Sequence, residues 1–172
     1  MVYGMKQVGP NRYREDLGRY YDEFEVGDIY EHRPGRTITE TDNVWFTMLT
    51  GNTHPVHFDY EYAKNSEFGQ PLVNSALTLS IVAGMSVSDT SQKAIANLGW
   101  EEIRLTAPVF HGDTIYAESE VLAKRESKSR PGQGIVTVET RGRKADGTQF
   151  MSYKRSFLIA KKGHGDVDKA EY

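Results

Sequence analysis

The stretch that decides the fold of this chain is Asn74-Ser75-Ala76-Leu77-Thr78-Leu79-Ser80-Ile81-Val82-Ala83-Gly84-Met85-Ser86-Val87. Asn74 can cap the start of a helix, because its side chain can accept a hydrogen bond from a backbone N–H group of the first turn. Between Ser75 and about Val87, apolar residues lie on nearly every side of the predicted helix. A helix without a polar face must be buried on most sides, so the rest of the chain is expected to enclose it.

The C-terminal half of the chain has the pattern of β-strands. Strands are predicted at residues 99–104, 113–122, 134–141 and 149–160. In the second of these, Ile115, Ala117, Ser119 and Val121 alternate onto one face. The dipeptide Asp146-Gly147 between the last two strands is typical of a hairpin turn. One buried helix followed by antiparallel strands predicts an α+β fold, in which a sheet wraps around a central helix.

Two shorter helices are predicted before the central one. Thr39 and Asp42 have the spacing of a capping box, with a carboxylate three residues after a hydroxyl. Four apolar residues then fall on one helical face: Val44, Trp45, Met48 and Leu49. Gly51 can end this helix, and Asp59 is expected to cap a second, short helix that contains Tyr62.

Length, charge and composition limit the class of protein. The 172 residues suit one domain, expected at 21–161, with a polar arm at 1–20 and a flexible tail at 162–172. The net charge of -3 offers no electrostatic case for binding nucleic acid. The absence of cysteine excludes disulfides and thiolate chemistry. No apolar run has the length of a signal peptide or a membrane span, so a cytoplasmic protein without membrane contact is expected.

A polar turn follows the first helix: Gly51-Asn52-Thr53-His54-Pro55-Val56-His57-Phe58-Asp59. Pro55 cannot continue a helix, so these side chains are expected on a stiff turn, where binding and catalytic groups collect. The turn resembles the signature of the MaoC-like, or R-specific, enoyl-CoA hydratases. In that signature a Gly, a catalytic Asp, any residue, Asn, Pro, an aliphatic residue and a catalytic His follow one another. Gly51, Pro55, Val56 and His57 match in order and spacing.

The resemblance extends over roughly residues 24–160. Pro71-Leu72-Val73 resembles the family segment that leads into the central helix, and Gly112-Asp113 resembles its Gly-Asp pair. It implies a hot dog fold, and a homodimer or higher homo-oligomer with the site between subunits. The implied activity is the reversible hydration of a 2-enoyl-CoA thioester. Coenzyme A would arrive as part of the substrate, and no separate cofactor is implied.

His57 is the candidate acid/base, because an imidazole ordinarily titrates near neutral pH. Asn52 stands where the family has its catalytic Asp, and a carboxamide cannot take up a proton. Three explanations are open. Asn52 holds the water or fixes the tautomer of His57; the substrate carries a carboxylate that compensates; or the site binds a thioester without chemistry. We favour the first two together, since the segment resembles the branch acting on mesaconyl-, itaconyl- and methylmalyl-type CoA esters.

Further residues are candidates for binding the substrate. Ser75 replaces the Gly whose backbone N–H meets the thioester oxygen in the family, a role for which Ser suffices. Asn74 either caps the helix or touches substrate, and the cap is the favoured role. His54 stands where the family has Asn, and either binds substrate or satisfies the local backbone. Arg36 and Arg104 could pair with the free carboxylate of a dicarboxylic substrate, or be surface charges.

Two other sites and two other functions are alternatives to this interpretation. His54, His57 and Asp59 do not share a helical face, so a metal site is not expected. The basic segment 124–132 either contacts the phosphates of coenzyme A or is a solvated hairpin tip, which we favour. A thioesterase of the same fold is disfavoured, because the central helix contains no Asp or Glu. A non-catalytic acyl-thioester-binding protein would tolerate Asn52.

Overall fold

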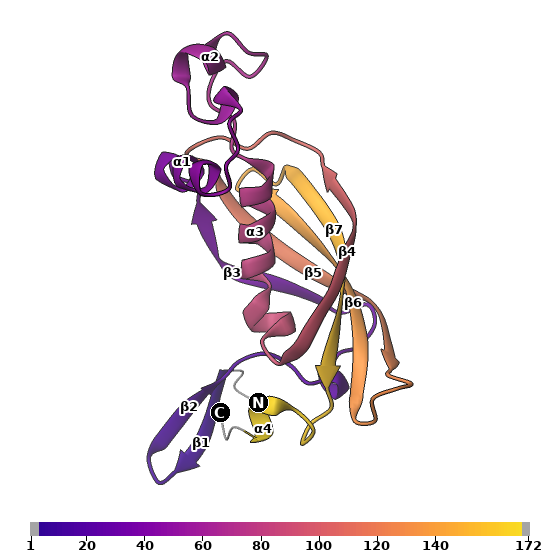
Figure 1. Ribbon diagram of the computed structural model, residues 1–172. Helices are drawn as coiled ribbons and strands as arrows, with labels where there is room; N and C mark the ends of the chain where they lie inside the picture. Colours follow the sequence, from indigo (N-terminus) through magenta and orange to yellow (C-terminus); the bar gives the residue numbers. More distant parts are fainter. Residues whose placement is uncertain (1–3, 170–172) are drawn as a thin grey trace.

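The computed structural model describes residues 4–169 (Figure 1). Its strands are β1 Gly4–Gly9, β2 Arg12–Asp16, β3 Ile29–Thr37, β4 Ala94–Leu105, β5 Thr114–Glu126, β6 Gln133–Lys144 and β7 Gln149–Ala160. Its α-helices are α1 Glu40–Leu49, α2 Tyr60–Lys64, α3 Ser75–Met85 and α4 Asp166–Lys169. A 3-10 turn, Pro55–His57, lies between α1 and α2, and a π-helical turn, Val87–Ser91, follows α3. None of these helices is long and apolar enough to cross a membrane.

Five strands form one antiparallel sheet in the order β3-β5-β6-β7-β4, and the sheet curves around α3 (Figure 1). This arrangement confirms the predicted α+β fold. All four strands predicted from the pattern are present, and the hairpin turn at Asp146-Gly147 joins β6 to β7. Strand β3 was not predicted. It forms one edge of the sheet, and most of its residues are exposed, so it lacks a clear alternation of apolar and polar residues.

Helix α3 begins at the predicted residue, and the side chain of Asn74 caps it by accepting a hydrogen bond from the Ala76 N–H at 3.0 Å. The helix packs into the concave face of the sheet. Leu77 and Val82 of α3 join Ile115 and Phe150 of the sheet in the main hydrophobic core. The burial expected from its apolar circumference is therefore confirmed, and this burial fixes where the N-terminus of α3 lies.

Helix α1 has the predicted capping box, since Thr39 Oγ1 accepts from the Asp42 N–H and the Asp42 carboxylate accepts from the Thr39 N–H. The apolar face predicted for it does not meet the core of this chain. Trp45 and Leu49 are 69% and 76% exposed, whereas the polar Asn43 and Thr47 are fully buried. Periodicity predicted the helix correctly, but the face that turns inward is the polar one, because Asn43 makes buried hydrogen bonds there.

The described parts of the expected arm and tail contact the domain more than their composition indicates. The expected arm contains the hairpin β1–β2, which is mostly exposed. At its base, Asp16 forms a 2.5 Å ion pair with the buried Lys93. The ring of Tyr20 is buried, and its hydroxyl donates to the Asp168 carboxylate of α4 at 2.8 Å. The boundaries expected at 20/21 and 161/162 therefore lie within a contacted region, and residues 1–3 and 170–172 lie outside the described residues.

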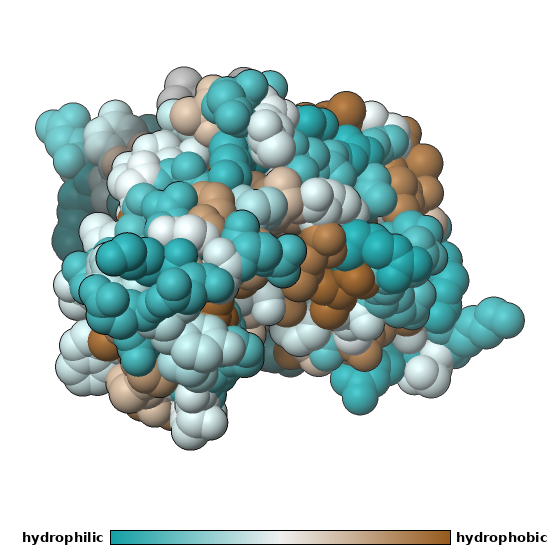
Figure 2. All heavy atoms as spheres, turned by 90° about the horizontal axis from the view of Figure 1, so that it is seen from above, coloured by the Kyte–Doolittle hydropathy of each residue, from teal (hydrophilic) through white to brown (hydrophobic). Residues whose placement is uncertain are grey.

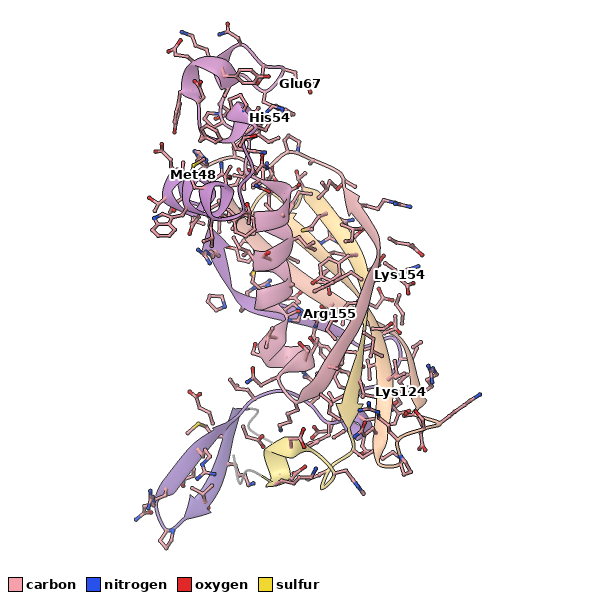
Figure 3. The ribbon with its side chains drawn as sticks, viewed as in Figure 1. Met48, His54, Glu67, Lys124, Lys154 and Arg155 are labelled. Carbon is pink, nitrogen blue, oxygen red and sulfur yellow. The ribbon has the colours of Figure 1, made fainter. Side chains whose placement is uncertain are left out.

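A layer of buried polar side chains lies below the main core, at the C-terminal end of α3. His32 donates through Nδ1 to the Asp89 carboxylate at 2.8 Å, and its Nε2 lies 2.8 Å from the Ser119 hydroxyl. Arg155 lies in the same part of the molecule (Figure 3), where its guanidinium donates to the hydroxyl of Thr90 at 3.1 Å. Burial lowers the pKa of His32 and outweighs the opposite effect of Asp89, so the folded protein favours the neutral ring more than the unfolded chain does.

Candidate functional site

The loop between α1 and α2 carries the matched motif, at the end of the molecule where α3 begins (Figure 1). Gly51 has a φ of 67°, a left-handed conformation that ends α1 without steric strain. The backbone N–H of Asn52 donates to the Thr47 carbonyl at 3.0 Å. The Asn52 Oδ1 atom accepts from the backbone N–H of His54 at 3.0 Å. These bonds connect the loop to the end of α1 and to its own backbone, as expected for a turn built around Pro55.

The imidazole of His57 is oriented by a main-chain carbonyl. Its Nδ1 lies 2.8 Å from the carbonyl oxygen of Leu72. A carbonyl oxygen can only accept, so Nδ1 carries the proton and donates it. Nε2 is then unprotonated in the neutral ring and free to accept a proton from another group. Leu72, and not Asn52, therefore sets the tautomer of His57.

Within residues 4–169, one N–H group at the start of α3 has no hydrogen-bond partner. Of the first four N–H groups of the helix, three are satisfied: that of Ala76 by the Asn74 side chain, and those of Leu77 and Thr78 by the Asn74 carbonyl. No hydrogen bond from the Ser75 N–H is found among residues 4–169. An N–H group at a helix start carries the positive end of the helix dipole, so it is suited to meet a developing negative charge.

A cavity of about 320 Å³ lies beside this free N–H group. Its lining comes from α3, the end of β4, the start of β7, the segment before α3 and the segment after β4: Phe68, Leu72, Val73, Ser75, Thr78, Leu105, Thr106, Ala107, Pro108, Val109 and Phe150. The lining is apolar except for three hydroxyl-bearing residues. His57 is not among these residues. Its ring is hydrogen-bonded to the main chain of Leu72, which lines the cavity.

Asn43 joins the parts of this site, and sequence reasoning missed it. Its fully buried side chain lies in α1. Nδ2 is 2.8 Å from the His57 carbonyl oxygen, 3.2 Å from the Leu72 carbonyl oxygen and 3.0 Å from Nε2 of His111. Oδ1 accepts the backbone N–H of Asn74 at 2.8 Å. The loop that bears His57 and the start of α3 are therefore both hydrogen-bonded to the side chain of Asn43.

His111 is a second residue that sequence reasoning missed. It is partly buried, and burial lowers its pKa more strongly than the Glu40 carboxylate raises it. Its Nε2 faces the amide of Asn43, so the neutral ring accepts there and carries its proton on Nδ1. It precedes the Gly112-Asp113 pair that the resemblance uses, which was the available signal.

The other predicted residues are placed as follows. His54 accepts the Val56 N–H through Nδ1 at 3.2 Å, so it satisfies the local backbone. It lies in the loop beside α2 (Figure 3). Arg36 pairs with Asp42 at 2.5 Å. Arg104 is exposed on edge strand β4. Neither guanidinium lines the cavity beside Ser75.

The basic segment 124–132 forms the turn between β5 and β6, and Lys124 lies at the opposite end of the molecule from His54 (Figure 3). The amino group of Lys124 donates to the Phe24 carbonyl, and Glu126 pairs with Lys161. The favoured prediction of a hairpin tip is confirmed. Among the described residues, no group of three His, Asp or Glu side chains could hold a metal ion.

Comparison with known proteins agrees with the geometry. A family model described as "MaoC like domain" matches residues 23–143. A mesaconyl-CoA hydratase of Cereibacter sphaeroides is 31% identical over 149 residues, which are 87% of this chain and 43% of that protein. The chain thus spans less than half the length of this relative.

Solved structures give the same result. A monoamine oxidase regulatory protein from Archaeoglobus fulgidus has 34% sequence identity and a TM-score of 0.75, with 84% of this chain and 96% of that chain covered. A Mycobacterium tuberculosis protein described as a double hot dog fold has a TM-score of 0.78 at 21% identity, with 85% of this chain and 45% of that chain covered. The hot dog fold expected from the resemblance is confirmed.

Proposed function

Because the chain belongs to the MaoC-like domain family, we propose that it catalyses the reversible hydration of a 2-enoyl-CoA thioester. One observation carries the proposal. An imidazole with a free Nε2 and a helix start with one free N–H are joined through Leu72 and Asn43 beside an apolar cavity. Hydration of an enoyl thioester needs a proton acceptor and an oxyanion donor held in this way.

In the proposed reaction, Nε2 of His57 accepts a proton from water while the water oxygen bonds to the β-carbon. The electron pair of the double bond moves toward the thioester, and the enolate oxygen accepts a hydrogen bond from the Ser75 N–H. The proton on Nε2 then passes to the α-carbon, so hydrogen and hydroxyl add to the same face. Dehydration follows the same steps in reverse. As Nε2 gains its proton, the bond from Nδ1 to the Leu72 carbonyl stabilises the imidazolium.

Asn52 is proposed to hold the attacking water. Its Oδ1 accepts from the His54 N–H, which fixes the orientation of the amide, and the proposed contact with water is made by Nδ2, a donor. A water molecule that accepts from Nδ2 can still donate to His57. Asn52 thus takes over the positioning part of the role of the family Asp, and His57 alone moves the proton.

The proposed substrate is a short, branched dicarboxylic acyl-CoA of the mesaconyl, itaconyl or methylmalyl type. Support comes from the relative named mesaconyl-CoA hydratase and from the size of the cavity, which lies at the lower end of the range for small-molecule sites. Two of the three hydroxyls of the lining, those of Thr78 and Thr106, donate to the main-chain carbonyls of Ser75 and Gln149, so the Ser75 hydroxyl is the one proposed to donate to the distal carboxylate. Arg104, which directly precedes the lining residue Leu105, is the arginine nearest in sequence to the lining and the proposed partner of that carboxylate.

A second copy of this chain is the proposed partner. Edge strand β4 exposes apolar side chains that a single chain leaves in water: Leu98, Trp100, Ile103 and Leu105 are 42–57% exposed. Figure 2 looks onto the end that carries α1 and α2 and shows further apolar surface between polar side chains. An unpaired apolar edge strand is a site for pairing with another chain. A dimer would also give two domains, as in the double hot dog protein.

The test is an absorbance assay of the full chain with crotonyl-, mesaconyl- and itaconyl-CoA, followed at the band of the conjugated double bond. The expected result is loss of absorbance without release of free thiol, fastest with a dicarboxylic substrate. Release of thiol would instead identify a thioesterase. No absorbance change with any of the three, alongside measurable binding, would overturn the proposal.

That last result would favour a second candidate, a non-catalytic acyl-thioester-binding protein. The observation in its favour is Asn52, which offers no proton acceptor where the family has a carboxylate. Substitution of Asn52 by Asp separates the two. Gain of turnover from an inactive wild-type chain would show that only the base was missing.

A further inference from the structure

We propose that Asn43 is a positioning residue of the reaction. Its side chain holds the loop that bears His57 and the N-terminus of α3, which bears the proposed oxyanion donor, in one fixed arrangement. The inference rests on the proposed function. It assigns no contact with substrate to Asn43, since this side chain is fully buried. Asn43 acts through His57, Leu72 and Asn74, the residues to which its side chain is hydrogen-bonded.

The orientation of the Asn43 amide follows from its partners. The backbone N–H of Asn74 lies 2.8 Å away and can only donate, so the atom facing it must be Oδ1. Nδ2 then faces the carbonyl oxygens of His57 and Leu72 and the Nε2 of His111. The two N–H groups are thus shared among three acceptors, and every polar atom of this buried amide has a partner. A carboxylate at this position would face two carbonyl oxygens and lose both donors.

These bonds connect residues far apart in the chain. The partners of Asn43 lie 14, 29, 31 and 68 positions away. The Leu72 carbonyl accepts from His57 Nδ1 and lies within reach of Asn43 Nδ2, so the atom that orients the imidazole is itself held by Asn43. Asn43 Oδ1 accepts a hydrogen bond from the backbone N–H of Asn74, the residue directly before Ser75, whose N–H is the proposed oxyanion donor.

The consequence is a geometric one. If the Asn43 side chain is removed, the hydrogen bonds that connect the His57 loop to the start of α3 are lost. The two segments can then shift relative to each other. A misplacement of about 1 Å between reacting groups can cost on the order of 100-fold in rate. The loss is expected in kcat, with KM changed little, because the groups that line the cavity are retained.

His111 supplies a signature that activity alone does not. Its Nε2 accepts from Asn43, so nitrogen-15 NMR of the wild-type protein near neutral pH should show His111 protonated on Nδ1. The same spectrum should show His57 protonated on Nδ1, as the bond to Leu72 requires. Either ring found as the Nε2–H tautomer would overturn the arrangement, and this measurement needs no variant.

The variants are Asn43→Ser, which keeps one small donor, and Asn43→Asp, which keeps the shape and loses the donors. Thr47→Val is the matched control. Thr47 lies one turn further along α1, is equally buried, and its hydroxyl has no hydrogen-bond partner among the described residues. Each variant is checked by circular dichroism and urea unfolding before turnover of mesaconyl-CoA and the His57 imidazole resonances are measured.

The expected result is a fall in kcat of about 100-fold in folded Asn43 variants, with changed His57 resonances and with Thr47→Val within about threefold of wild type. A folded Asn43→Ser protein with kcat within about threefold of wild type and unchanged His57 resonances would overturn the proposal. If the wild-type chain has no turnover, the proposed function fails, and the resonances of His57 still decide whether Asn43 positions it.

Discussion

Substitution of Ser75 by Pro separates the proposed oxyanion role of one backbone N–H from the stability of the helix that carries it. Ser75 is the first residue of α3, where Pro is well tolerated because its missing N–H has no helical partner. Asn74 has a ψ of 125°, in the range that a residue before Pro adopts. The Ser75 N–H makes no bond within the described chain, so its loss breaks no internal hydrogen bond.

The magnitude follows from the count of donors at the helix start. The N–H groups of Ala76, Leu77 and Thr78 are occupied by Asn74, so none of them can replace that of Ser75. Removing one oxyanion donor costs about 3–4 kcal/mol of transition-state stabilisation, a fall of about 10²–10³ in kcat. The free energy of unfolding is expected to stay within about 1 kcal/mol of wild type or to rise, since Pro restricts the unfolded chain.

The assay measures kcat and kcat/KM with mesaconyl-CoA and the free energy of unfolding in urea. Both kinetic constants should fall together, because the lost bond is made chiefly in the transition state. Ser75→Ala retains the N–H and distinguishes it from the hydroxyl, so this variant should keep most of the wild-type kcat. A stable Ser75→Pro enzyme with kcat within about threefold of wild type would refute the assignment of the oxyanion donor.

Three further outcomes are expected. His57→Ala should lower kcat by about 10²–10⁴-fold and Asn52→Ala by a smaller factor, and a His57→Ala enzyme with wild-type turnover would remove the proposed base. Burial lowers the pKa of His32 against the opposite effect of Asp89, so the unfolded chain takes up a proton near about pH 6.5 and the folded protein only at a lower pH. The stability from neutral His32 is therefore complete above that pH and is lost on acidification, by up to about 1.4 kcal/mol per pH unit. Urea unfolding at about pH 7.5 and about pH 5.5 should show a larger loss for wild type than for His32→Gln, and equal losses would contradict this. Trp100→Glu, on the exposed face of β4, should convert the oligomer to a monomer in light scattering; a monomeric wild-type chain would contradict the proposed partner.

The features predicted correctly are those set by neighbours in sequence. The capping box at Thr39 and the cap at Asn74 each involve residues two or three positions apart. The inward face of β5 follows from strict alternation, and Ile115, Ala117 and Val121 are buried as predicted. The prediction of His57 as the acid/base likewise rests on the spacing of a short motif, and it stays a prediction. Such signals can be read from the sequence, because the atoms that make the contact are held close by the chain itself.

Contacts between distant segments could not be read in this way. The pattern of α1 indicates an apolar face, yet the single chain buries Asn43 and Thr47 and leaves Trp45 in water. The inward face depends on what α1 packs against, which periodicity does not specify. For the same reason His111 and the Leu72 carbonyl were not predicted, since each makes its hydrogen bond only where a distant side chain meets it.

The sequence by itself determined that an apolar helix must be enclosed by an antiparallel sheet, and that a polar turn with His57 precedes it. Both follow from local propensities and from the cost of leaving an apolar helix in water. Only the tertiary structure decided which nitrogen of His57 is free, which N–H of α3 is unoccupied, and which buried amide connects the two. These depend on hydrogen bonds between residues up to 68 positions apart, and such bonds form only when packing has brought their segments together.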